Sequence, residues 1–206
     1  MAVNNYDTDV FINCPFDDDF KQIFYAIVFT VFDCGFRARC SLEEDDGGGV
    51  RIEKISNIIH QSKYGIHDIS RTELCNVNKL PRFNMPLELG LFLGAKRFGD
   101  RNQQKKICLI TDTERYRYQK YISDISGQDI KAHNNNHEAA ICTVCNWLRS
   151  ASKKTTIPGG KEIIKRYKLY RIALPKLCQK TKIEQDEITF NDHATFISEW
   201  LKVNAR

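Results

Sequence analysis

An acidic residue near the start of a predicted helix is the feature of this sequence with the clearest chemical use. The segment Asn84-Met-Pro-Leu-Glu-Leu-Gly90 follows a strand-like run and opens a helix, with Asn84 or Met85 as the N-cap and Glu88 in the first turn. Open α/β sheets bind ligands at the carboxyl ends of their strands, and a helix dipole favours an ionised acid there. Such a carboxylate can stabilise positive charge on a sugar.

Both polar residues of this turn also have a simpler interpretation. Asn84 lies one turn before Glu88, on the same helix face, where it either hydrogen-bonds a ligand or acts only as the N-cap. Glu88 itself either serves chemistry or only stabilises the helix, as acids in first turns often do. The position of these residues leaves both alternatives open.

Further side chains with chemical potential are expected at the same edge of the sheet. Asp68 and Ser70 end the third predicted strand and either point into a ligand crevice or only start the next turn. Arg71 and Arg82 lie on the following connection, 71–83, where each either binds a pyrophosphate or faces solvent. Phe16, after the first strand, either stacks on a ring of a ligand or belongs to the core.

These residues require a framework, and the sequence predicts one in which strands and helices alternate. Short intervals between strands indicate a parallel α/β sheet with helices on both faces and right-handed crossovers. The predicted strands are 9–14, 36–41, 64–69, 105–111 and a short edge strand at 129–132. The predicted helices are 20–34, a segment from Ile52 to Ile59, 84–98, 118–126 and 137–150.

The chain is expected to comprise a main domain, 1–154, and a helical C-terminal extension, 155–206, separated near Pro158-Gly-Gly160. Two helices are predicted in the extension, at 162–174 and 192–203, with apolar stripes that either pack on the main domain or bind a partner. Residues 151–206 hold 12 Lys/Arg and 6 Asp/Glu. A moderately basic helix is more often a solvated face than a nucleic-acid-binding surface, so nucleic acid is not an expected partner.

Cysteine usage and hydropathy exclude other classes. Eight cysteines without a signal-peptide pattern indicate reduced thiols in a cytoplasmic protein. Cys142 and Cys145 have the spacing of a metal or redox pair, but they lie in a predicted helix and no second pair completes a tetrahedral site. We therefore expect no metal. The longest apolar run, 23–32, is far shorter than the roughly 20 residues that span a bilayer, so no membrane partner is expected.

Three motifs in this order resemble the bacterial TIR-like and nucleoside 2-deoxyribosyltransferase-like superfamily. They are Asp9-Val-Phe-Ile-Asn-Cys-Pro-Phe-Asp17, His67-Asp-Ile-Ser70 and Asn84-Met-Pro-Leu-Glu-Leu-Gly90, and the resemblance covers about residues 7–150. It implies a flavodoxin-like sheet of about five strands, whose central strands end at a nucleotide pocket. It also implies an activity on the bond that joins a sugar C1′ to a nitrogen base.

The resemblance implies roles for particular residues. Relatives carry a glutamate at the start of the helix after the third strand, which contacts or attacks the ribose, and Glu88 matches this position. Other pocket-lining positions resemble the turn after the first strand and the segment from Asp68 to Ser70. Together with the residues inferred above, the expected substrate-binding set is Asn13, Pro15, Phe16, Asp17, Asp68, Ser70, Arg71, Arg82, Asn84 and Met85.

The TIR-like branch implies a hydrolase that consumes NAD and needs no further cofactor. Such enzymes release nicotinamide and form ADP-ribose or a cyclised or conjugated signal, often in antiviral defence with copies of themselves or a defence-system partner protein. The Pro86-Leu-Glu-Leu-Gly90 pattern replaces the Trp-Cys pattern of eukaryotic TIR sequences, which argues against a receptor adaptor.

Two alternatives to NAD consumption stay open. One is a nucleoside or nucleotide N-glycosidase or deoxyribosyltransferase, although the basic helical tail replaces the short acidic ending that many deoxyribosyltransferases carry, and transfer between free bases is therefore less favoured. The other is a non-catalytic TIR-like module that senses a nucleotide or binds a partner.

Overall fold

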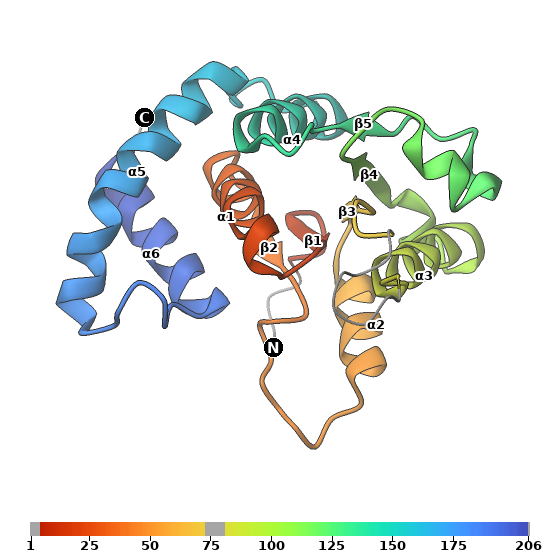
Figure 1. Cartoon of the computed structure of the whole chain (residues 1–206), viewed down its shortest axis with the longest axis horizontal. Helices are drawn as coiled ribbons and strands as arrows, with labels where there is room; N and C mark the ends of the chain where they lie inside the picture. The colour runs from red at the N-terminus through yellow and green to blue at the C-terminus, as the bar shows by residue number, and fades with distance from the viewer. Residues whose placement is uncertain (1–4, 73–80, 206) are drawn as a thin grey trace.

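The computed structural model describes residues 5–72 and 81–205, and its centre is a five-stranded parallel sheet (Figure 1). The strand order is β2-β1-β3-β4-β5, with every neighbouring pair parallel. This is the flavodoxin-like order, so the predicted fold class is confirmed. The strands are β1 (Asp9–Asn13), β2 (Arg37–Arg39), β3 (Tyr64–Asp68), β4 (Ile107–Asp112) and β5 (Lys131–Ala132).

Helices cover both faces of the sheet (Figure 1). The α-helices are α1 (Asp18–Asp33), α2 (Arg51–Gln61), α3 (Asn84–Phe98), α4 (His137–Ser152), α5 (Gly160–Thr181) and α6 (Phe190–Val203). Short 3-10 turns are η1 (Gln103–Lys105), η2 (Arg117–Lys120) and η3 (Ser123–Ile125). Among the described residues, no helix combines the length and the apolar character that a membrane crossing requires.

The alternation of side chains along β1 divides the core into two layers. Val10 and Ile12 belong to the cluster that includes α1 and α4, whereas Phe11 packs with Ile58 of α2 and Phe92 of α3. Successive strand residues point to opposite faces, and both faces of this strand are covered. The continuous apolar run of β1 is therefore the pattern of a central parallel strand.

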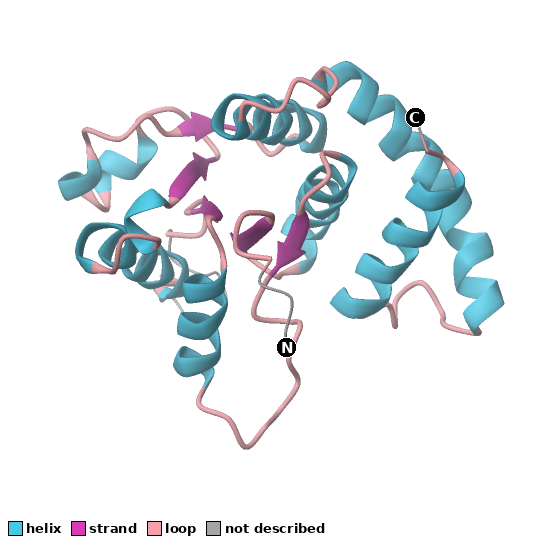
Figure 2. Cartoon of the chain, turned by 180° about the vertical axis from the view of Figure 1, so that it is seen from behind, coloured by secondary structure: helices cyan, strands magenta, loops and turns pink. Residues whose placement is uncertain are grey.

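The C-terminal helices pack outside α1 and α4 and share the main core (Figures 1 and 2). Phe29 of α1 has its ring centroid 5.2 Å from that of Tyr170 and 5.9 Å from that of Trp200. At the start of α5, a Cβ on Gly160 would lie 2.9 Å from Cα of Cys142. Only glycine allows this approach of α5 to α4.

Two predicted helices differ from the structure. The segment 118–126 forms the separate turns η2 and η3 instead of one helix, because Ile122 between them has the non-helical torsion angles φ −139° and ψ 70°. The helix predicted at 162–174 continues through Pro175 to Thr181. Leu174 and Cys178, on either side of the proline, are both buried in the core, and this packing supports the helix where proline removes one hydrogen bond.

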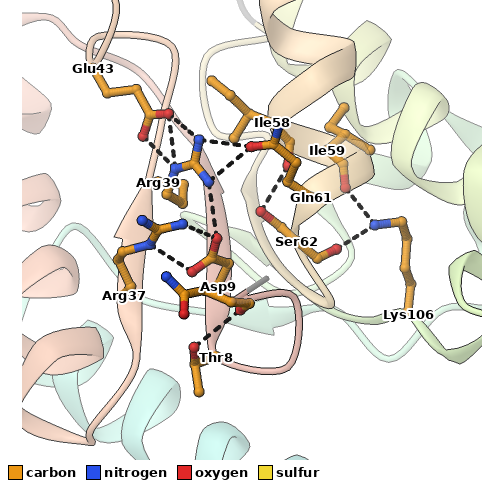
Figure 3. A network of polar contacts seen from close by, with 11 residues as sticks. Thr8, Asp9, Arg37, Arg39, Glu43, Ile58, Ile59, Gln61, Ser62 and Lys106 are labelled. Carbon is orange, nitrogen blue, oxygen red and sulfur yellow. Dashed lines mark hydrogen bonds and ion pairs between the residues drawn. The ribbon is translucent and has the colours of Figure 1, made fainter. Parts of the chain in front are cut away.

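A polar network fastens the edge of the sheet to α2 (Figure 3). Asp9 accepts hydrogen bonds from Arg37 and Arg39, and Arg39 also pairs with Glu43 and donates to the side chain of Gln61 at the end of α2. These contacts fix the start of the loop between β2 and α2, which borders the candidate site described next.

Candidate functional site

The carboxyl ends of β1 and β3 lie at the topological switch point of the sheet. After β1, the chain adds β2 on one side of β1 and then β3 on the other side. Open α/β sheets bind ligands at such a switch point. Asn13 ends β1 and is 2% exposed. Its side-chain amide donates to the carbonyl of Met85 at 2.8 Å and to Nδ1 of His67 at 3.1 Å. One side chain thus connects β1, β3 and the start of α3.

His67 is neutral at this junction. Burial lowers its pKa to about 3, and the charge of Lys106 acts in the same direction. Because Nδ1 accepts the Asn13 amide hydrogen, the ring proton lies on Nε2, on a ring packed at a centroid distance of 4.8 Å from Phe92. The histidine therefore supplies packing and one acceptor to the switch point.

Glu88 lies in the second turn of α3, not in the first turn as the sequence indicated. The N-cap is Phe83, which carries no capping side chain, so neither Asn84 nor Met85 is the cap. The carbonyl of Phe83 accepts from the amide of Leu87 at 2.9 Å, which starts the helix one or two residues earlier than predicted. The dipole effect falls off within the first turn, so Glu88 gains less from it than expected.

The carboxyl group of Glu88 is buried and resists ionisation. It is 7% exposed. Burial raises its pKa to about 7, and the charge of Arg51 opposes this rise. In the ligand-free protein, the loss of water on burial therefore outweighs the helix dipole, which was expected to favour the ionised form of this acid.

The electrostatic neighbours of Glu88 show which strands it faces. Burial raises the pKa values of the Cys14 and Cys40 thiols, and the charge of Glu88 adds to both rises. Cys14 follows β1 and Cys40 follows β2. The carboxylate on α3 therefore lies near the carboxyl ends of the strands at the switch point.

Asp68, at the end of β3, has both oxygens engaged within the protein. Oδ1 accepts from the backbone amide of Ser70 at 3.0 Å and from its hydroxyl at 2.5 Å. Oδ2 accepts from Thr111 Oγ1 at 2.7 Å and pairs with His133 Nε2 at 3.0 Å. Asp68 and Ser70 are buried, and their contacts fit the turn-forming role that the sequence left open beside substrate binding.

Asp17 brings together the two arginines that were predicted to bind a pyrophosphate. Its carboxylate caps α1 by accepting from the amide of Phe20 at 3.1 Å. It also pairs with Arg71 at 3.0 Å and with Arg82 at 3.2 Å. Residues 73–80, between these arginines, lie outside the described residues. A phosphate at this place would compete with Asp17 for both guanidinium groups.

The remaining predicted residues differ in exposure. Pro15 and Met85 are buried, and Asn84 is exposed. Phe16 is 38% exposed and packs edge-on against Phe24 with a centroid distance of 5.2 Å. Phe16 also borders a described cavity.

That cavity has a volume of about 500 Å³ and lies beside the carboxyl ends of β1 and β2. Arg51 and Ser41 line it, and the guanidinium donates to the Ser41 hydroxyl at 3.0 Å. Because Arg51 is also the cation whose charge acts on Glu88, it connects the cavity to the candidate carboxylate. The full lining is Phe16, Asp18, Lys21, Phe24, Tyr25, Ser41, Leu42, Glu44, Asp45, Arg51, Ile188, Thr189, Phe190 and Asn191.

The sequence analysis did not identify Arg51 or His133 as residues of this region. Arg51 follows the glycine run of the β2–α2 loop and begins α2, so its place at the strand edge could have been inferred from the loop alone. His133 comes directly after β5 and could have been found by the same strand-end rule that selected Asp68. Across 5–72 and 81–205 no group of three or more His, Cys, Asp or Glu side chains is arranged to hold a metal ion.

Comparisons with protein-family models, with curated proteins and with solved structures found no match. The structure defines the class of protein as a flavodoxin-like α/β fold. Membership of the TIR-like and deoxyribosyltransferase-like superfamily stays a prediction that rests on the three sequence motifs.

Proposed function

We propose that this protein is a TIR-like enzyme that consumes NAD by breaking the bond between nicotinamide and ribose, with Glu88 as the essential carboxylate. The observation that carries the proposal is the burial of Glu88 near the strand ends of the switch point, with its pKa raised to about 7. Acids whose pKa is strongly shifted by burial, at the ligand-binding edge of a sheet, are typical of functional sites. The order of the three motifs supports the same conclusion.

The chemistry requires stabilisation of charge more than proton transfer. The nicotinamide ring is cationic in NAD and leaves as a neutral molecule, so positive charge grows on the ribose as the C1′–N bond breaks. A carboxylate held in a water-poor site stabilises that charge strongly. Binding of the cationic substrate also lowers the pKa of Glu88, because a nearby positive charge favours the ionised form. The acid thus becomes a carboxylate when the substrate arrives.

The product depends on which nucleophile reaches C1′. Water gives ADP-ribose, a ring nitrogen of the same molecule gives a cyclic product, and another molecule gives a conjugate. In each case the electron pair of the breaking bond leaves with nicotinamide. We propose a cytoplasmic role in bacterial antiviral defence, with NAD or a related nucleotide as ligand and further copies of the chain or a defence-system protein as partners.

Nicotinamide release from NAD tests this function. Purified protein is incubated with NAD over a range of protein concentrations, so that self-association is covered, and nicotinamide is measured by chromatography. Glu88→Gln should lower the rate at least 100-fold, whereas Glu53→Gln, which changes an exposed acid on α2, should not. Equal turnover by Glu88→Gln would remove this residue from the mechanism. Ligand binding without turnover at any concentration would favour the non-catalytic alternative.

The raised pKa of Glu88 also supports a second candidate, a nucleoside or nucleotide N-glycosidase or deoxyribosyltransferase. A neutral nucleobase leaves more easily when an acid protonates it, and an acid with a pKa of about 7 is partly protonated at neutral pH. Incubation with deoxynucleosides and a free acceptor base distinguishes the two functions. Release or exchange of the base, without nicotinamide release from NAD, would favour this candidate.

A further inference from the structure

The C-terminal extension forms part of the wall of the 500 Å³ cavity. Ile188, Thr189, Phe190 and Asn191, at the start of α6, line it together with residues of α1 and of the β2–α2 loop. The cavity is therefore completed by a segment that begins 100 residues after Glu88 in the sequence. This contribution was not predicted, because the extension was considered only as packing or as a partner surface.

Contacts on two sides hold this wall in place. Phe190 stacks on Phe24 of α1, with ring centroids 6.2 Å apart. The side-chain amide of Asn191 donates to the carbonyl of Glu43 at 3.1 Å, which connects α6 to the β2–α2 loop. Thr189 caps α6 through a reciprocal pair of hydrogen bonds with Asp192, which fixes the position of the first turn.

The lining has the composition of a site for a planar ring. Rings of Phe16, Tyr25 and Phe190 line the cavity, and Phe16 is partly exposed and thus accessible. Both signs of charge are present, from Lys21, Arg51, Asp18, Glu44 and Asp45. Cavities of a few hundred Å³ with aromatic walls and a few polar groups are typical of small-ligand sites.

We propose that this cavity is the subsite for a heteroaromatic ring of the nucleotide substrate, and that Phe190 of the C-terminal extension determines the affinity for that ring. The choice of ligand rests on the proposed function. Arg51 connects the cavity to the candidate carboxylate, since it lines the cavity and its charge lowers the pKa of Glu88. NAD carries two such rings, adenine and nicotinamide. The chemistry that they share is a flat π-surface that stacks on phenylalanine and tyrosine.

Binding measurements in the Glu88→Gln background test the proposal without consuming the ligand. ADP-ribose, which carries adenine alone, and nicotinamide mononucleotide, which carries nicotinamide alone, are titrated by calorimetry. Phe190→Ala should raise the Kd of one of these probes roughly tenfold, and Phe190→Leu should have a smaller effect. The probe that is affected identifies the ring.

Two further variants keep the test decisive. Phe190 is buried, so a loss of binding in its variants could follow from a loss of folding. Phe16→Ala changes a partly exposed ring instead, and it should also weaken binding of the same probe. Ile172→Ala changes an exposed residue of α5 outside the cavity lining and should leave Kd unchanged. Circular dichroism verifies that each variant is folded.

The outcomes separate this inference from the proposed function. Unchanged Kd values for both probes in folded Phe16→Ala and Phe190→Leu, or no binding of either probe, would overturn the inference. Nicotinamide release by the unmodified protein with an unaltered KM in Phe16→Ala would leave the function intact and reject the subsite. Loss of probe binding in the variants, without any turnover of NAD, would support the subsite and reject the function.

Discussion

The side-chain amide of Asn13 donates a 2.8 Å hydrogen bond to the backbone carbonyl of Met85, which ties the end of β1 to the first turn of α3. Glu88 lies three residues further along the same helix. The position of the candidate carboxylate therefore depends on a contact between two residues that were predicted to bind substrate.

Asn13→Ala should destabilise the protein by about 2–3 kcal/mol, because it leaves the buried acceptors of Met85 and His67 without their donor. Asn13→Asp should cost more, since a carboxylate oxygen would face both acceptors. Urea denaturation measures these changes, with Asn57→Ala at an exposed position as the control. A change below about 0.5 kcal/mol in Asn13→Ala would show that the contact contributes little.

Glu88→Gln should change stability in a pH-dependent way. The pKa of Glu88 rises from 4.5 to about 7 on folding. Between these values the folded chain holds the proton and the unfolded chain does not, so this group lowers stability as the pH increases through that window. Glutamine does not ionise. The variant should therefore be more stable than the unmodified protein by on the order of 2–3 kcal/mol at pH 8 and about equal at pH 4.

Denaturation curves at both pH values measure this difference. Glu53→Gln, at an exposed position of α2, is the matched control and should change stability equally little at either pH. A stability difference for Glu88→Gln that does not vary with pH would contradict the raised pKa.

The pH dependence of activity should distinguish the two candidate reactions. If Glu88 acts as a carboxylate on NAD, kcat/KM should rise with an apparent pKa near 7, since this ratio reports ionisation in the free enzyme. If Glu88 protonates a departing neutral base, kcat/KM for nucleosides should fall through the same region. Initial rates between pH 5 and pH 9 measure both profiles.

Asp68→Asn should destabilise the protein by about 3 kcal/mol. Oδ1 of Asp68 accepts from the backbone amide of Ser70, and Oδ2 pairs with Nε2 of His133, whose Nδ1 accepts from the amide of Asn135. Because neither donor can rotate its hydrogen away, the NH₂ group of asparagine would face one of them in either orientation. Asp129→Asn, at an exposed position, should have almost no effect. Thermal unfolding of both variants provides the comparison, and equal Tm values would exclude a structural role for the network.

Lys106 should make a contribution to stability that grows with pH. Its ammonium donates to the carbonyl of Ile59 at 2.5 Å, at the end of α2 (Figure 3). Burial lowers its pKa from 10.5 to about 8, with the charge of Asp100 acting in the opposite direction. Between these values the folded chain releases the proton and the unfolded chain keeps it, so stability rises with pH across that window.

Comparison with Lys106→Met isolates this effect. The stability of the unmodified protein relative to the variant should increase by up to about 3 kcal/mol from pH 7.5 to pH 10.5. Lys105→Met, at an exposed position, should show no such trend. A relative stability that is constant over this range would contradict the lowered pKa of Lys106.

The sheet could be predicted from sequence because its strands have unambiguous patterns. The apolar run of β1 and the alternation of strands with helical segments determine a parallel sheet, and all five strands lie within a few residues of their predicted bounds. The local sequence pattern did not predict the end of a helix where tertiary packing determines it. The helix predicted at 162–174 ends before Pro175, but buried residues on both sides of this proline allow α5 to continue to Thr181.

The candidate site was only partly predictable for a related reason. Strand-end rules place Asn13, Asp68 and Glu88 in one region, but they do not indicate which side chains turn inward to one another. A capping position shifted by one or two residues moved Glu88 out of the first turn, and burial then determined its pKa. The contribution of Phe190 depends on the path of α5 and α6, which short motifs do not contain.

The lengths of the two outermost strands restrict how this protein associates with itself. β2 has three residues and β5 has two, so neither border of the sheet offers an extended row of unpaired backbone groups. Continuous sheets between molecules need such a row. Any assembly of several copies would therefore be built through helices and loops, and its strength could be tuned by single surface side chains.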